Sequence, residues 1–208
     1  MEEGRQIHRE EFKDTDIAKI SGVLQQDFQE SHVCRGEVFF SSVIAVLRNS
    51  GTVDHVPIIV SGDFLTSTKG EGKYVEVKGS IRTRDVEGED GKQHLKVFVF
   101  VDKINITDDL GKLENPMNLN YVYLKALICN TPHLRKTPKG KTIADFIVMK
   151  QFAHKYFIPC ICWSKMAYYS QNFSRHDEVT IEGRFQSRTY YKNDEAKETY
   201  ELSVTHFL

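Results

Sequence analysis

Aromatic side chains lie in a strand-like run from Phe157 to Trp163, at a spacing that suits contact with nucleic acid. Side chains along a strand alternate between its two faces, so Phe157 and Trp163 share one face. The other face carries a small apolar set that suits a core: Ile158, Cys160 and Cys162. Flat rings on an outer face can stack on the bases of an unpaired strand. We therefore expect Phe157 and Trp163 to stack bases, the alternative being that these rings only cover the core.

A second strand-like run, from Glu178 to Tyr190, alternates in the same way. Its predicted inward set is apolar or small: Val179, Ile181, Gly183 and Phe185. Its predicted outward set is cationic, polar or aromatic: Arg184, Gln186, Arg188 and Tyr190. Cations beside rings suit a single nucleic acid strand, because they neutralise phosphates while the rings hold bases.

The formal net charge is only -1, so binding to a polyanion has to come from local patches. Residues 133–155 form such a patch, with six lysines and arginines against the single acid Asp145. Four of the bases lie in a loop that we expect to contact phosphates: Arg135, Lys136, Lys139 and Lys141. The alternative interpretation is a flexible, solvated loop. Phosphate contacts of this kind position a strand without reading its sequence.

The composition is that of an ordinary globular protein, with 40% hydrophobic and 27% charged residues in 208. No apolar run is long enough for a membrane span, and the first residues lack a secretory signal. The cysteines match neither a disulfide framework nor a zinc motif, so we expect reduced core thiols in a cytoplasmic protein. The histidines match no ligand spacing, and catalytic motifs are lacking. We therefore expect no enzyme activity, no metal and no cofactor.

Alternating hydrophobicity and turn signals predict five strands in each half of the chain. In the first half they span Ile17–Leu24, Phe39–Arg48, Asp54–Ser61, Tyr74–Arg84 and His94–Thr107. In the second half they span Asn120–Cys129, Thr142–Gln151, Tyr156–Trp163, Glu178–Tyr190 and Thr199–Leu208. A helix is predicted over Ser164–Phe173 with Ser164 as its N-cap, and a single helical turn between the third and fourth strands of the first half.

The two halves align with each other at a shift of 104 residues, which matches Gly79 to Gly183 and Arg84 to Arg188. Such a repeat indicates a tandem duplication of one unit. Five strands with a helix after the third is the order of an OB-fold. We therefore predict an all-β protein of tandem five-stranded OB-fold barrels with one short helix per domain. The predicted division is a tail at 1–14, a first barrel at 15–107, a linker at 108–119 and a second barrel at 120–208.

The second half resembles the bacterial single-stranded-DNA-binding proteins along nearly its full length. The resemblance rests on four motifs in order: Asn120–Leu124 (NYVYL), Pro132–Gly140 (PHLRKTPKG), Trp163–Ala167 (WSKMA) and Val179–Tyr190 (VTIEGRFQSRTY). The first half resembles the two-domain members of this family from Gram-positive bacteria, notably over Val56–Ser61.

This resemblance implies stacking roles for Phe157, Trp163 and Tyr190, with a fourth ring near Phe152 or His154. In the first half the corresponding places hold His55, Ser61, and Asp85 or Val86, so we expect a degenerate binding face there. Related binders assemble four OB-folds, which implies a homodimer of this two-barrel chain. The complete expected site comprises Phe152, Phe157, Trp163, Tyr190, Arg135, Lys136, Lys139, Lys141, Lys165, Arg184 and Arg188.

The sequence thus predicts binding of single-stranded DNA with little sequence preference, in replication, repair or recombination, in the cytoplasm at the nucleoid. The family's acidic-hydrophobic tail does not follow the last strand, which favours a role other than general replication binding. Two alternatives stay open. One is an accessory protein-interaction module of a replication or mobile-element system with weak DNA binding. The other is an RNA-binding OB protein, because base stacking does not depend on the sugar.

Overall fold

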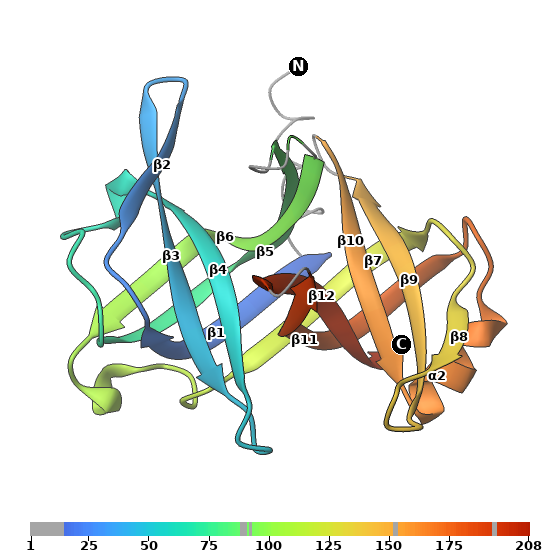
Figure 1. Ribbon diagram of the computed structural model, residues 1–208. Helices are drawn as coiled ribbons and strands as arrows, with labels where there is room; N and C mark the ends of the chain where they lie inside the picture. The colour runs from blue at the N-terminus through green and yellow to red at the C-terminus, as the bar shows by residue number, and fades with distance from the viewer. Residues whose placement is uncertain (1–14, 88–90, 92, 152–153, 193–194) are drawn as a thin grey trace.

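The computed structural model describes residues 15–87, 91, 93–151, 154–192 and 195–208. The predicted tail at 1–14 and Phe152 therefore lie outside the described residues. Within them the chain is almost entirely β-structure, arranged as two barrels side by side (Figure 1).

In the described residues the first half of the chain contains six strands, one more than the sequence predicted. They are β1 (Asp16–Leu24), β2 (Gln29–Cys34), β3 (Glu37–Leu47), β4 (Val53–Ser61), β5 (Tyr74–Glu87) and β6 (Gln93–Thr107). The second barrel repeats this order with β7 (Asn120–Ile128), β8 (His133–Lys136), β9 (Thr142–Gln151), β10 (Lys155–Trp163), β11 (Glu178–Lys192) and β12 (Glu195–Phe207).

Strand pairing closes each half into a five-stranded barrel. In the first half the order β3-β4-β6-β5-β1 is closed by pairing of β3 with β1. In the second half the order β7-β11-β12-β10-β9 is closed by pairing of β7 with β9. The pairs β4–β6 and β10–β12 are parallel and the rest are antiparallel, which is the strand order of the OB-fold. The prediction of tandem OB-fold barrels is confirmed.

Three local features differ from the sequence-based expectation. The strands β2 and β8 were missed, because each is a short, mostly exposed strand that pairs with the long strand after it. The predicted helix is shorter: α2 spans Lys165–Tyr169 and continues as a 3-10 turn, Ser170–Asn172. Ser164 occupies the N-cap position at φ 49°, but its side chain makes no capping hydrogen bond. The first barrel has only a 3-10 turn at the corresponding place, Gly62–Phe64.

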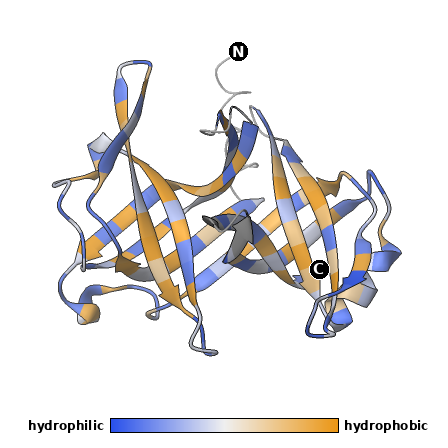
Figure 2. Ribbon diagram, viewed as in Figure 1, coloured by the Kyte–Doolittle hydropathy of each residue, from blue (hydrophilic) through white to orange (hydrophobic). Residues whose placement is uncertain are grey.

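The core of each barrel is built from the inward faces of its strands. Apolar and polar residues alternate along the strands, as Figure 2 shows. Fully buried side chains include Ile20 and Ile58 in the first barrel, and Ile158 and Phe185 in the second. Cys160 and Cys162 are buried as expected. Cys34 is exposed, so the prediction that it is a core thiol was wrong. Cys34 differs because it ends β2, which lies outside the closed barrel.

Equivalent glycines sit at equivalent β-bulges in the two barrels. The register of β5 against β6 shifts at Gly79, and that of β11 against β12 shifts at Gly183. A Cβ at Gly79 would lie 2.1 Å from the carbonyl oxygen of Phe100, and one at Gly183 2.4 Å from that of Ser203. The close approach of two backbones explains why both halves carry glycine here.

The two barrels share one continuous sheet, because β1 pairs antiparallel with β7, from Asp16 opposite Leu124 to Ile20 opposite Asn120. The long strand β11 also passes beside β4 of the first barrel. There the Ser187 amide donates to the buried Asp54 carboxylate at 3.0 Å, and the His55 amide donates to Ser187 Oγ at 2.9 Å. Both strand pairing and side chains therefore hold the barrels together.

Asp16 and Asn120 occupy equivalent places at the start of β1 and β7. The Asn120 side chain accepts from the Phe185 amide and donates to the Phe185 carbonyl, both at 2.8 Å. Asp16 accepts from the Ile81 amide at 3.3 Å, but a carboxylate cannot donate to the Ile81 carbonyl.

Lys150 of the second barrel supplies the missing donor. Its Nζ donates to the Ile81 carbonyl at 3.2 Å and forms a buried ion pair with Asp16. Burial raises the pKa of the Asp16 carboxyl and lowers the pKa of the Lys150 ammonium, and the attraction between the two groups opposes both shifts. The contact of Lys150 with the Ile81 carbonyl joins the two barrels. It takes the place of the hydrogen bond that Asn120 makes to the Phe185 carbonyl within the second barrel.

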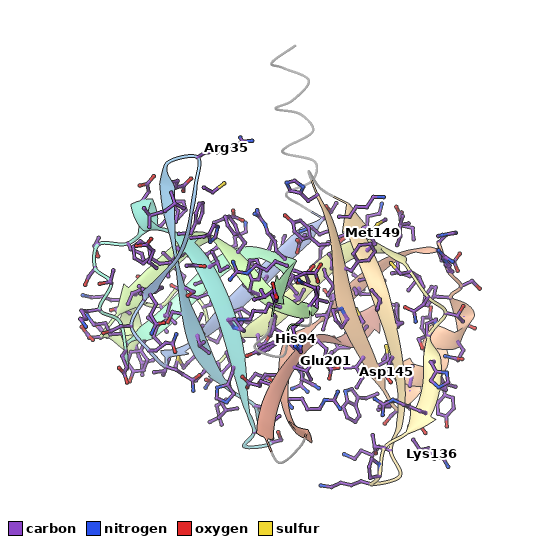
Figure 3. All side chains as sticks on the ribbon, turned by 45° about the horizontal axis from the view of Figure 1, so that its top comes forward. Arg35, His94, Lys136, Asp145, Met149 and Glu201 are labelled. Carbon is purple, nitrogen blue, oxygen red and sulfur yellow. The ribbon has the colours of Figure 1, made fainter. Side chains whose placement is uncertain are left out.

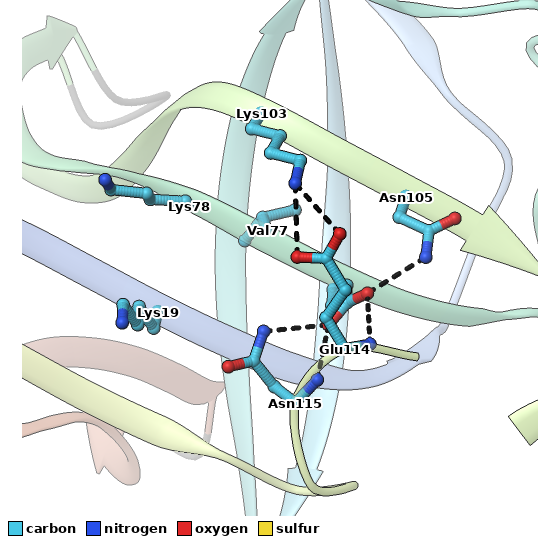
Figure 4. Close-up of a pocket in the computed structure, with 8 residues that line it drawn as sticks. Lys19, Val77, Lys78, Lys103, Asn105, Glu114 and Asn115 are labelled. Carbon is cyan, nitrogen blue, oxygen red and sulfur yellow. Dashed lines mark hydrogen bonds and ion pairs between the residues drawn. The ribbon is translucent and has the colours of Figure 1, made fainter. Parts of the chain in front are cut away.

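Residues 108–119 are anchored to the first barrel rather than hanging between the two. The Glu76 carboxylate accepts hydrogen bonds from the amides of Glu114 and Asn115 and from the side chains of Asn105 and Asn115, at 2.8–2.9 Å (Figure 4). Although burial acts to raise the pKa of Glu76, these hydrogen bonds lower it below its usual value. Our division of the chain at 107/108 and 119/120 stays a prediction.

Candidate nucleic-acid interface

The outer face of β9 and β10 presents large apolar side chains to solvent. Phe157 is 46% exposed and stands opposite Met149 in the antiparallel ladder. Ile147, 40% exposed, pairs with Pro159 one step along the same face. Ile161 shares the parity of this face but is buried, which differs from the outward placement expected from alternation. The exposed part of the face is therefore concentrated toward the Phe157 end.

Trp163 ends β10 opposite Ile143 and is half-buried. Its indole Nε1 is buried and has no hydrogen-bond partner among the described residues. The ring is therefore neither sealed in the core nor fully open. Lys165, at the start of α2, is exposed close by in the chain. Trp163 is therefore partly accessible, and an exposed cation follows it two residues later in the chain.

The basic loop is split between one paired cation and three exposed ones. Arg135 on β8 is engaged by Asp145 on β9, with Nη2 donating to Oδ1 at 3.2 Å and Nε to Oδ2. Lys136, Lys139 and Lys141 are exposed around the turn between these strands. Figure 3 shows Lys136 at this turn, with Asp145 and Met149 farther along β9. The Asp145 pair was missed because β8 itself was not predicted.

The short helix adds an aromatic residue to this end of the barrel. Tyr168 and Tyr169 are 61% and 48% exposed. Helix α2 has only five residues, so it covers the barrel end with Ala167 alone buried. The Tyr168 hydroxyl lies 3.3 Å from Thr142 Oγ1, next to Lys141. Tyr168 therefore extends the aromatic and basic surface at this end of the barrel.

The outward face of β11 is only partly open. Arg184 is half-buried, and its Nη2 donates to Gln186 Oε1 at 3.3 Å. Burial, together with the nearby Arg48, lowers the pKa of Arg184. Gln186, expected to face outward, is buried and donates to Glu201 at 2.9 Å. Arg188 is exposed, with Nε 3.9 Å from Glu201 Oε1. The outward side chains of β11 are partly covered here because β11 passes beside the first barrel.

Two carboxylates lie among these cations. Asp145 is half-buried beside Arg135, and Glu201 is buried beside Gln186 and Arg188 (Figure 3). Burial raises the pKa of Glu201, while Arg188 and the Gln186 hydrogen bond oppose that change. The face is thus less cationic than a count of its lysines and arginines indicates.

The side chains of two expected site residues lie outside the described part of the structure. Phe152 lies outside the described residues. The backbone of Tyr190 lies in β11 opposite Lys197, but its side chain is also outside the described part. Among the described residues, no group of three or more His, Cys, Asp or Glu is arranged to hold a metal ion. No helix in that part of the chain is long and apolar enough to span a membrane.

Comparison with known proteins shows what the second barrel and the whole fold resemble. Residues 119–208 match the model of the single-strand binding protein family. The second barrel thus matches the model of that family, in agreement with the four motifs in its sequence.

A curated single-stranded DNA-binding protein of Halalkalibacterium halodurans is 32% identical over 85 residues. The match covers 36% of this chain and 51% of that protein, so it spans about half the length of this relative.

The whole chain resembles structures of the single-stranded DNA binding protein from Thermus aquaticus. The wild-type form and a deletion mutant both align with a TM-score of 0.71 and 17% identity. The alignments cover 93% of this chain and 91% and 93% of those chains, respectively. At this identity the likeness shows the fold: two OB-fold barrels in one chain.

Proposed function

We propose that this protein binds single-stranded DNA with little sequence preference, chiefly through its second barrel. The observation that carries the proposal is the exposed Phe157 on the same strand as the half-buried Trp163, with the exposed Lys165 two residues after that tryptophan in the chain. The family match over residues 119–208 supports the same face. The site residues are those predicted from the sequence, with Tyr168 added.

The proposed mechanism is stacking combined with release of counterions. Each base stacked on an aromatic ring contributes ~1–3 kcal/mol, whichever base it is. Lys136, Lys139 and Lys141 surround the turn between β8 and β9 without fixed base-reading geometry. Contacts of such lysines with phosphates fix position rather than sequence. Low sequence preference follows from both contributions.

The biological part of the proposal extends the family match. We place the protein in the cytoplasm at the nucleoid, in replication, repair or recombination, acting by binding without catalysis or cofactor. Assembly as a homodimer would bring four OB-folds together. Light scattering of the free protein tests that state, since a monomeric mass would contradict it.

The test of DNA binding uses Trp163, the single tryptophan of the chain. Titration with oligo(dT) should quench its fluorescence, and affinity should fall steeply when salt is raised, because each neutralised phosphate releases counterions. An oligo(U) of equal length serves as competitor. No binding of either strand would contradict the proposal, and stronger binding of oligo(U) would favour the RNA alternative.

A further inference from the structure

The first barrel carries an aromatic cluster of its own, separate from its core. Phe39 on β3, Ile59 on β4 and Phe98 on β6 are buried together, and Phe100 packs against them. In the cross-strand register, Ile59 lies beside Phe100, and Phe98 faces Arg82. We call Phe39, Ile59, Phe98 and Phe100 the first-barrel cluster. It lies on the outer face of the barrel, as the binding face of the second barrel does.

Two arginines lie over the rings of this cluster. The guanidinium carbon of Arg82 is 3.6 Å from the centre of the Phe100 ring, and that of Arg84 is 5.9 Å from the centre of Phe98. His32 stacks on Phe39 with centroids 4.9 Å apart and planes 9° apart. A guanidinium held over a ring can still offer N–H groups to a base or a phosphate. The cluster is therefore a platform of paired rings and cations.

The second barrel has no such cluster at the equivalent positions. Counting from the matched glycines, Phe98 and Phe100 correspond to Glu201 and Ser203, which are polar and buried. Arg82 corresponds to Gln186. The first barrel thus lacks aromatic residues where the second has Phe157 and Trp163, but carries them on a different strand of the same face. This arrangement differs from simple loss of a binding face.

A groove connects this platform with the second barrel. It has a volume of about 240 Å³ and is lined by Arg84, Lys96 and Phe98 from the first barrel and by Tyr200 from β12 of the second. Arg84 and Lys96 face each other across β5 and β6, and both are exposed. Two cations, a ring and a tyrosine from the neighbouring barrel suit a strand that passes from one barrel to the other.

We propose that the first barrel binds the same single-stranded DNA through the first-barrel cluster with Arg82, Arg84 and Lys96. The inference rests on the proposed function, which it extends from one barrel to both. It replaces the expectation of a degenerate binding face in the first barrel. Continuity through the Tyr200 groove and complementary charge favour a DNA strand over a protein as the occupant.

The experiment compares a short and a long oligonucleotide, because one OB-fold contacts roughly 4–16 nucleotides. Labelled oligo(dT) of about 10 and about 30 nucleotides is titrated with the full chain and followed by anisotropy. The test variant is Arg82→Gln/Arg84→Gln. The control is Lys19→Gln/Lys78→Gln, which removes two exposed charges that face each other on β1 and β5 of the same barrel. Circular dichroism verifies that both variants are folded.

We expect the test variant to lose roughly tenfold in affinity for the long strand, since it loses two cations that would contact phosphates and support the rings of the cluster. Its affinity for the short strand should change less than about twofold, and its occluded site should shrink. Equal losses in test and control variants would overturn the inference, as would an unchanged test variant. If the unmodified chain did not bind the short strand at all, that result would instead contradict the proposed function itself.

Discussion

At the scale of single residues, exposure separates side chains that can stack from side chains that only resemble them in type. Phe157 and Phe64 are both exposed phenylalanines, at 46% and 51%. Phe157 lies on the proposed binding strand β10, whereas Phe64 ends the 3-10 turn of the first barrel.

Replacement of Phe157 by alanine should weaken oligo(dT) binding by roughly 5- to 100-fold, the equivalent of the ~1–3 kcal/mol that one stacked base contributes. Phe64→Ala removes a ring of similar exposure and serves as the control, with no expected change. Anisotropy with labelled oligo(dT) measures both. Equal affinities of the two variants would exclude Phe157 from the site.

The ion pair between Arg135 and Asp145 leads to a prediction of the opposite sign. Asp145→Asn removes a negative charge from the proposed face and releases Arg135 for phosphate contact. We therefore expect tighter binding, by roughly three- to tenfold at low salt, and a steeper dependence of affinity on salt, because one more phosphate is neutralised. Asp63→Asn, at an exposed carboxylate of the first barrel, is the control. Weaker binding of the Asp145 variant would show that the pair positions the loop instead.

At the scale of elements, the bulges at Gly79 and Gly183 fix how each long strand bends into its barrel. Gly183→Ala would place a Cβ against the Ser203 carbonyl oxygen, so β11 and β12 would have to separate. We expect a loss of about 1–3 kcal/mol in the free energy of unfolding, typical of overpacking. Guanidinium titration followed by far-UV circular dichroism measures it. Gly111→Ala, whose added Cβ meets only a side-chain oxygen at 3.3 Å, should be nearly neutral.

Strand alternation and the internal repeat were sufficient to predict the barrels, because both depend on contacts inside one repeat. Alternation placed Ile158, Cys160 and Cys162 in the core and Phe157 outside, as found. It failed at Gln186, which is buried where β11 passes beside the other barrel. A pattern within one strand carries no information about a neighbour that meets its outer face.

The candidate site was less predictable for the same reason. The second barrel could be read through its family motifs, but the first-barrel cluster combines β3, β4 and β6 at positions that no motif marks. Phe98 and Phe100 were assigned only to a predicted strand, and their pairing with Arg82 and Arg84 needs the register of β5 against β6. Position-by-position comparison of the repeats therefore missed it.

At the scale of the whole molecule, the Asp16–Lys150 ion pair couples the two barrels. The equivalent position of the second barrel, Asn120, makes its hydrogen bonds within one barrel instead. Asn120 satisfies both backbone groups of Phe185 within its own barrel. Asp16 satisfies only the amide of Ile81, and Lys150 from the other barrel satisfies the carbonyl. An asparagine in place of Asp16 could make both hydrogen bonds locally, as Asn120 does.

Asp16→Asn alone should therefore destabilise the protein by about 3–5 kcal/mol, because the buried Lys150 ammonium loses the Asp16 carboxylate with which it forms an ion pair. Addition of Lys150→Met should restore stability to within about 1 kcal/mol of the parent, since apolar replacement of a buried ion pair is often neutral. Lys19→Met, at an exposed lysine of β1, is the control for loss of a lysine. Guanidinium unfolding is followed by Trp163 fluorescence, which reports on the second barrel, and by circular dichroism, which reports on both.

If Asp16→Asn alone were as stable as the parent, the pair would not couple the barrels. If the double variant unfolded in two separate steps, the ion pair rather than the β1–β7 ladder would be what makes the barrels unfold together.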